Sequence, residues 1–205
     1  MLKFYRAELI EVEAGDFDAA INMRDGLAEI NGWFNCNQFH NPLNMEVHYK
    51  TTGPEIWEQF NSYSDSRQYG RSMWMEAFVA GTGTGGTIMG AGKYLSEKCP
   101  GMETIAVEPE ESPVMSGGKP GLHGIQGIGD GSKFLVDLKK VSEVKTVKTE
   151  CAKAVAKYLA LRYGLFVGIS AGANVFAAFQ YLHDNNKKTV ITILCDRGER
   201  YLSCL

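Results

Sequence analysis

Apolar residues recur at helical spacing in several segments of the chain. In residues 17–30 they lie three or four positions apart, which is typical of one buried helix face. Asp16 stands where the N-cap of this helix is expected. Pro54 and Glu55 in residues 51–60 indicate the start of another helix. The same reasoning predicts helices at residues 87–98, 149–163 and 171–182, with Gly164 ending the second of these.

Short apolar runs lie between these segments and predict strands. Residues 33–44 are mixed and rich in asparagine, so we expect a short strand followed by a loop there. The order strand, helix, strand in residues 75–107 indicates a right-handed parallel crossover. The alternation as a whole predicts an α/β fold with a mostly parallel sheet flanked by helices. The other expected strands are residues 4–12, 75–80, 104–107, 166–169 and 189–194.

Composition narrows the class of protein. The chain has 205 residues, of which 44% are hydrophobic and 22% charged, and these values are ordinary for a globular protein. A net charge of −3 and the lack of a basic block favour neither nucleic acid nor a membrane as a partner. The five cysteines form no C-x-x-C pair, and the four histidines are scattered. We therefore expect a reduced cytoplasmic protein without a metal site.

The sequence GTGTGG at residues 81–86 follows one predicted strand and opens the next helix. Glycines let a main chain approach an anion closely, and the unpaired N–H groups of a helix start attract phosphate. Glu108, which ends the next strand, is placed as a ribose-binding acid would be in an NAD(P) site. Thr82, Thr84 and Thr87 instead favour a phosphate monoester, because hydroxyl donors suit a dianion. A tight turn without a ligand is the third possibility.

Residues 110–135 hold seven of the 23 glycines and two prolines. A loop of this length inside a compact domain is usually functional.

Four separated regions, in order and at matching spacing, resemble the cysteine synthase and cystathionine β-synthase family of pyridoxal 5′-phosphate (PLP) enzymes of fold type II. The resemblance covers essentially the whole chain and implies a tryptophan synthase β-like fold. The regions are QFHNPLN (38–44) with TTGPEIW (51–57), GTGTGGTIMGAGKYL (81–95), EPEESPVMSGGKPGLHGIQGIGDG (108–131), and VGISAGAN (167–174) with GERYLS (198–203).

The resemblance implies roles for particular residues. Ser170 matches the family serine that meets the pyridine nitrogen; its alternative role is the N-cap of the following helix, and the two roles are compatible. Gln38 matches a glutamine near the substrate carboxylate, or is an ordinary polar residue. Gly127 and Gly129 match the flexible loop beside the substrate. The cup for the cofactor phosphate is formed in this family by the residues that match Gly83, Thr84, Gly85, Gly86 and Thr87.

Asp130 departs from the family pattern, in which many cysteine synthases carry a small apolar residue. We predict that it acts as an acid or base, or positions a water, on the aminoacrylate, and so favours elimination or addition of water. The alternative is a solvated loop carboxylate.

The N-terminal motif that carries the family's Schiff-base lysine has no match in these 205 residues. The resemblance therefore implies residues 1–45 as the remnant of a smaller domain and residues 46–205 as the larger, phosphate-binding domain.

The expected function is PLP-dependent β-replacement or β-elimination on a serine- or cysteine-type amino acid, with sulfide made or consumed. Cysteine synthase and cysteine desulfhydrase activities share an aminoacrylate and are not separated by the sequence. Because the lysine is missing, these residues are expected to be part of an enzyme in which a longer chain or a second polypeptide provides that lysine. The family implies a homodimer. A non-catalytic module that binds PLP or a partner is the alternative, and an NAD(P)-binding domain is a weaker one.

Overall fold

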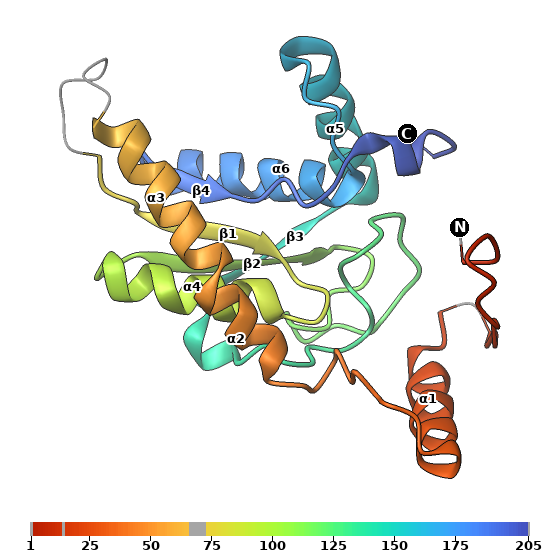
Figure 1. The fold of residues 1–205 in the computed structure, drawn as a ribbon. Coiled ribbons are helices and arrows are strands. Elements are labelled where there is room, and N and C mark those ends of the chain that lie inside the picture. The colour runs from red at the N-terminus through yellow and green to blue at the C-terminus, as the bar shows by residue number, and fades with distance from the viewer. Residues whose placement is uncertain (1, 14, 66–72, 205) are drawn as a thin grey trace. The chain divides into compact units, whose positions relative to one another are not determined.

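The computed structural model describes residues 2–13, 15–65 and 73–204, drawn as a ribbon in Figure 1. The chain is divided into two compact units, residues 1–37 and residues 38–205. The first unit contains α1 (Phe17–Asn31). Asp16 caps this helix as predicted, because its Oδ1 accepts a hydrogen bond of 2.8 Å from the Ala19 N–H. The predicted division into domains at residue 45 stays a prediction.

The second unit is an α/β fold, and its four strands form one parallel sheet in the order β3-β2-β1-β4. The central pair is in register from Ala77 opposite Glu103 to Gly81 opposite Val107. The strands are β1 (Ala77–Gly81), β2 (Glu103–Pro109), β3 (Glu143–Val147) and β4 (Val190–Thr192). The helices are α2 (Leu43–Lys50), α3 (Thr52–Asp65), α4 (Gly86–Lys98), α5 (Thr149–Tyr163) and α6 (Ile169–Asp184), with short 3₁₀ turns at Leu138–Lys140 and Gly198–Tyr201.

Helices cover both faces of the sheet. Figure 1 shows α6 on one face, and α4 with α2 and α3 on the other. Side chains alternate accordingly along β1: Ala77 and Val79 belong to the core under α6, while Phe78 and Ala80 belong to the core with α4. Because both faces are buried, the strand appears in the sequence as a continuous apolar run.

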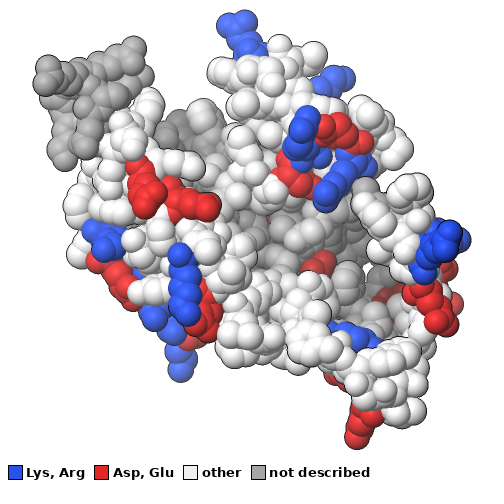
Figure 2. Space-filling model, in the orientation of Figure 1, with Lys and Arg blue, Asp and Glu red and all other residues white. Residues whose placement is uncertain are grey.

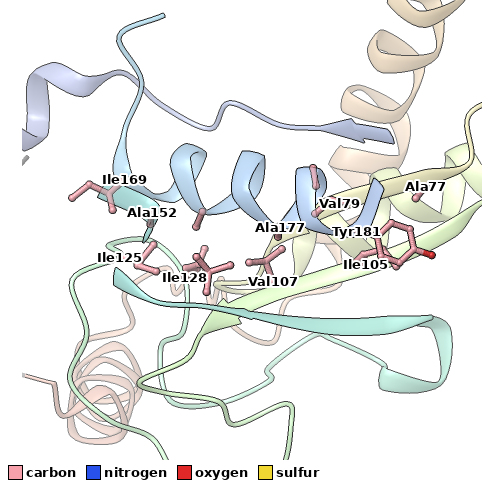
Figure 3. Packing of buried hydrophobic residues seen from close by; sticks show 13 residues of the cluster. Ala77, Val79, Ile105, Val107, Ile125, Ile128, Ala152, Ile169, Ala177 and Tyr181 are labelled. Carbon is pink, nitrogen blue, oxygen red and sulfur yellow. The ribbon is translucent and has the colours of Figure 1, made fainter. Parts of the chain in front are cut away.

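The long glycine-rich loop contributes to this core. Ile125 and Ile128 are fully or almost fully buried and pack with Val107 of β2 and Ile169 of α6 (Figure 3). Two anchors of this kind fix the stretch of loop between them against the sheet. The loop is therefore held next to the carboxyl ends of β1 and β2, where ligands of open α/β sheets bind.

Several predicted elements differ from the structure. Residues 7–13 have no regular structure, and residues 33–37 form no strand, because neither segment has a partner strand among the described residues. Residues 43 and 44, at the end of the segment expected as strand and loop, belong to α2 (Leu43–Lys50). Of the strand expected at residues 166–169 only a single bridge between Val167 and Arg197 remains. The strand β3 was not predicted, because its sequence EVKTV has the mixed pattern of an edge strand.

The helices at residues 87–98, 149–163 and 171–182 are confirmed as α4, α5 and α6, and Gly164 ends α5 in the left-handed conformation. No helix within the described ranges is long and apolar enough to cross a membrane. Basic and acidic side chains are interspersed over the visible face in Figure 2.

Candidate functional site

A cavity of about 440 Å³ opens where α4 and α6 begin. The turn between β1 and α4, the glycine-rich loop, the first turn of α6 and the segment 195–201 all contribute to its wall. Gly129, one of the ten predicted site residues, lies behind the wall and donates its N–H to the Thr82 carbonyl at 3.0 Å. The other nine line the cavity together: Gln38, Gly83, Thr84, Gly85, Gly86, Thr87, Gly127, Asp130 and Ser170.

The turn between β1 and α4 is held rigidly from behind. The Thr82 N–H and hydroxyl both donate to the Val107 carbonyl, at 3.0 and 2.9 Å. The Leu135 N–H donates to the Thr84 carbonyl at 3.1 Å, which ties the glycine-rich loop to the turn. Gly85 is the N-cap of α4 at a φ of 88°, and no side chain caps the helix. Apart from the Gly86 N–H, which points to Thr84 Oγ1, the N–H groups of the first turn of α4 are thus left for a ligand.

Each glycine of this turn makes room for a particular neighbour. A Cβ on Gly83 would lie 2.6 Å from the Gly127 carbonyl oxygen, and one on Gly85 would lie 2.6 Å from Val136 Cγ2. A Cβ on Gly86 would overlap Oδ1 of Asn44, which belongs to α2. The pattern GTGTGG is therefore needed for close packing around the turn as well as for approach of an anion.

Asn44 supports the turn from outside. Its Nδ2 donates to the Gln38 carbonyl at 2.9 Å and to Thr84 Oγ1 at 3.0 Å. The Gly86 N–H also points to Thr84 Oγ1, at 3.3 Å. Thr84 thus accepts two hydrogen bonds, which leaves its own proton to donate into the cavity.

Ser170 lies in the first turn of α6 and is almost fully buried. The N-cap of α6 is Gly168, so the alternative reading of Ser170 as the N-cap is wrong. The Ser170 hydroxyl bonds to the Cys195 thiol, and Asn174 Nδ2 donates to Cys195 Sγ at 3.3 Å. Desolvation raises the pKa of the Cys195 thiol, while these two hydrogen bonds act in the opposite direction.

Asp196 places a carboxylate beside the start of α6. Tyr201 donates its hydroxyl to Oδ2 of Asp196, and Oδ1 is buried without a hydrogen-bond partner among the described residues. A Cβ on Gly168 would overlap this Oδ1, so the carboxylate lies directly against the N-cap of α6. Desolvation and the Asp196 carboxylate raise the pKa of Tyr201 to about 12.

Asp130 lines the cavity from the glycine-rich loop and is half-buried. Burial raises the pKa of Asp130, and the nearby His123 works in the opposite direction. His123 is itself held by the loop, since Nε2 donates to the Gly129 carbonyl at 3.1 Å and Nδ1 accepts from the Ile125 N–H at 3.2 Å. Asp130 therefore differs from a freely solvated loop carboxylate.

Glu108 does not face the cavity. Its carboxylate is fully buried and accepts hydrogen bonds from the Met115 N–H at 2.7 Å, and from the Ser116 N–H at 2.9 Å and hydroxyl at 2.6 Å. These bonds fold the chain that follows β2. The interpretation of Glu108 as a ribose-binding acid, which had added support to the NAD(P) alternative, is wrong.

The arrangement suits a phosphate monoester joined to a flat, partly apolar group. The glycine turn, two threonine hydroxyls and the open start of α4 form a concave set of donors. Ser170, Cys195 and Tyr201 lie on other parts of the same wall. These features fit a phosphate monoester such as PLP, with Ser170 as a further hydroxyl on the wall. None of the described residues that line the cavity is a lysine or an arginine.

Sequence reasoning missed Asn44, Cys195 and Asp196 as parts of this site. Asn44 stands within the matched stretch QFHNPLN, so the resemblance carried a signal for it. Cys195 and Asp196 follow an apolar run and carry no local signal. Only the fold brings them against the start of α6.

Comparison with known proteins agrees with this geometry. A family model described as "Pyridoxal-phosphate dependent enzyme" matches residues 1–196. A cysteine synthase of Staphylococcus aureus is 40% identical over 208 residues, which include 99% of this chain. The chain spans 63% of the length of this curated relative.

Two solved structures are similar over almost the whole chain. Cysteine synthase from Entamoeba histolytica has a TM-score of 0.85 at 35% identity, and the match covers 99% of this chain and 58% of that one. A hydrogen sulfide-producing enzyme from Fusobacterium nucleatum has a TM-score of 0.89 at 33% identity, with 99% and 60% covered. The chain therefore belongs to the family of pyridoxal-phosphate dependent enzymes and, within it, to the fold type II group of cysteine synthase and cystathionine β-synthase.

Proposed function

We propose that the native protein carrying this chain binds PLP and catalyses β-replacement or β-elimination on a serine- or cysteine-type amino acid. The observation that carries the proposal is that the glycine turn of residues 83–87 and Ser170 line the same cavity. The similar proteins include a cysteine synthase and a hydrogen sulfide-producing enzyme. Making cysteine and producing sulfide are both outcomes expected of reactions of this type.

The chain's own residues divide the work of holding the cofactor. The turn from Gly83 to Thr87 holds the phosphate by main-chain N–H groups, two hydroxyls and the positive end of α4. Ser170 meets the ring nitrogen. When bound, PLP supplies an electron sink for negative charge that develops at the α-carbon of the substrate. A neutral hydroxyl stabilises a charged ring nitrogen less than a carboxylate would, which suits loss of a β-substituent over transamination.

Substrate contacts come from Gln38 and from the loop that contains Gly127 and Gly129. Asn44 fixes the Gln38 main chain, so that the glutamine side chain is presented at the cavity wall. The loop is tied to the cup through the Gly129 N–H and Leu135 N–H bonds. Contact of a substrate with the loop is thereby transmitted directly to the turn that holds the phosphate.

Asp130 favours elimination, or addition of water, over addition of sulfide. A carboxyl at this point of the cavity wall can accept a proton from a water and return it, and burial favours its protonated form by raising its pKa. Asp130→Asn keeps the size of the side chain and removes this capacity. We expect the variant to keep PLP but to release less sulfide, with the balance of products moving toward replacement. An unchanged product spectrum would remove Asp130 from the mechanism.

The reactive lysine is proposed to come from outside these 205 residues, since no lysine lines the described part of the cavity. Borohydride reduction of the native protein with PLP, followed by peptide mapping, tests the whole proposal. A pyridoxyl-modified lysine on a longer form or a co-purifying chain supports it. Modification of a lysine within this chain would require a different active site, and bound PLP without any modification would favour a non-catalytic module.

Sulfide and a small amino acid are the expected partners, and a homodimer in the cytoplasm is the expected state. Sedimentation of the native protein tests the dimer.

A further inference from the structure

Helix α2 forms a second layer behind the glycine turn. It packs closely on α4, because a Cβ on Gly90 would overlap the Met45 carbonyl and lie 2.8 Å from His48 Cβ. Asn44 and His48 are four residues apart and so project from the same side of α2. Each contacts one threonine of the turn: Asn44 contacts Thr84 and His48 contacts Thr87.

The direction of the Asn44 contact is fixed by its surroundings. The amide nitrogen of Asn44 faces the Gln38 carbonyl, which can only accept. The same nitrogen must therefore donate to Thr84 Oγ1, at 3.0 Å. With the Gly86 N–H as a second donor at 3.3 Å, Thr84 has its proton left for the cavity.

The direction of the His48 contact depends on which ring nitrogen carries the proton. Nδ1 lies 2.9 Å from Thr52 Oγ1 and Nε2 lies 3.3 Å from Thr87 Oγ1. Burial lowers the pKa of His48, which favours the neutral ring with a single N–H. If the proton is on Nδ1, Nε2 accepts from Thr87, and Thr87 then presents only oxygen lone pairs to an anion. If the proton is on Nε2, Thr87 accepts from His48 and donates into the cavity.

An anion in this turn depends strongly on neutral donors, because no lysine or arginine lines the described wall. A threonine hydroxyl that presented its lone pairs to the phosphate would repel the phosphate oxygens. We propose that α2 sets both threonines of the turn as donors: Asn44 donates to Thr84, and His48, protonated on Nε2 and backed by the Thr52 hydroxyl on Nδ1, donates to Thr87. Asn44 and His48 are thus positioning residues for a phosphate monoester, an inference that rests on the proposed function.

The experiment compares PLP with pyridoxal, which lacks the phosphate, as ligands of the native protein. We expect His48→Ala to weaken PLP binding about tenfold, the size of one hydrogen bond to a charged group, and to leave pyridoxal binding unchanged. His48→Gln should restore most of the loss, because its amide can donate to Thr87. His183→Ala is the matched control, since His183 is exposed at the far end of α6.

A double-mutant cycle separates positioning from general damage. Thr87→Val should weaken PLP binding about tenfold as well, and adding His48→Ala should change it by less than about twofold, because His48 acts only through Thr87. Additive losses, or equal losses for PLP and pyridoxal, would overturn the inference. Melting temperatures of the variants without ligand show whether folding is affected.

Nitrogen NMR of the histidine rings reads the tautomer directly. Protonated Nε2 and unprotonated Nδ1 in His48 are expected, and the opposite tautomer in the PLP-bound protein would overturn the inference. If the wild-type protein does not prefer PLP over pyridoxal at all, the proposed function fails first. A preference for PLP with no effect of His48→Ala refutes only the role of α2.

Discussion

Two helices begin at the cavity, and their starts are built in opposite ways. Both α4 and α6 have a glycine N-cap, Gly85 and Gly168, and neither is capped by a side chain. The start of α4 is surrounded by threonine hydroxyls and main-chain N–H groups. The start of α6 instead has the carboxylate of Asp196 against Gly168.

The two helix starts differ in the source of the negative charge that lies against the positive end of the helix. A helix start is a weak positive pole, and a carboxylate beside it is stabilising. At α6 the chain provides that carboxylate itself. At α4 the donors are gathered. Asp130 lies beside Gly83, but the cap residue Gly85 has Val136 and Leu135 as its nearest described neighbours, so the positive pole is open to an external anion. Two similar turns thus acquire different functions through the residues that pack on them.

The largest expected effect comes from blocking the open helix start. In Gly86→Ala the new Cβ would overlap Asn44 Oδ1, so Asn44 must leave Thr84 and the turn must shift. We expect PLP binding to weaken by more than about a hundredfold, because the overlap and the lost hydrogen bonds act together. Fluorescence titration with PLP measures it.

Gly92→Ala on the same helix is the control for this change. Its Cβ would lie 3.3 Å from Thr104 Cγ2, away from the cavity wall. PLP affinity should stay within about threefold of the wild type, as for a substitution that only tightens packing. Equal losses in the two variants would mean that α4 packing, and not the cup, governs binding.

A smaller effect is expected from removing the internal carboxylate. Asp196→Asn takes the charge from the start of α6 and weakens the bond from Tyr201, so the free energy of unfolding should fall by about 1–2 kcal/mol. The pKa of Tyr201, now about 12, should fall toward 10, although desolvation keeps it above that value. Denaturant unfolding and NMR titration measure the two changes.

Asp184→Asn at the other end of α6 tests whether position matters. Its carboxylate lies 3.5 Å from Lys145 Nζ and is largely exposed, so we expect a loss below about 0.5 kcal/mol. If both variants lose the same stability, the placement of Asp196 at the helix start has no special value.

The smallest effect concerns Asp130, near the open start of α4. Burial raises its pKa, so the folded state disfavours the ionised form relative to the unfolded chain. The resulting loss of stability is complete above the folded-state pKa and disappears below the unfolded value of 3.8. Asp130→Asn should therefore stabilise the protein at pH 7, by less than about 1 kcal/mol, and progressively less as the pH falls. A gain that does not depend on pH would contradict this account.

Local patterns were sufficient for most of the second unit. Periodic apolar spacing and a glycine stop placed α5 within the bounds observed, and a short apolar run before GTGTGG placed β1 and the start of α4. These elements are buried on defined faces, so their burial is reflected in the sequence. The strand expected at residues 4–12 was wrong, because an alternating pattern is not sufficient for a strand, which also requires a hydrogen-bonded neighbour.

The sequence by itself determined the α/β class, the glycine turn at the start of α4 and the set of residues that resemble a PLP site. Glycines and hydroxyls close together in the chain carry that information locally. Only the tertiary structure decided that the Glu108 carboxylate accepts hydrogen bonds within the chain that follows β2, and that Asp196 lies at the start of α6. It also decided that Asn44 contacts Thr84 and that His48 contacts Thr87. Apart from the bonds of Glu108 to the nearby Met115 and Ser116, those contacts join residues far apart in the chain. Their hydrogen-bond directions depend on which partner can only donate or only accept.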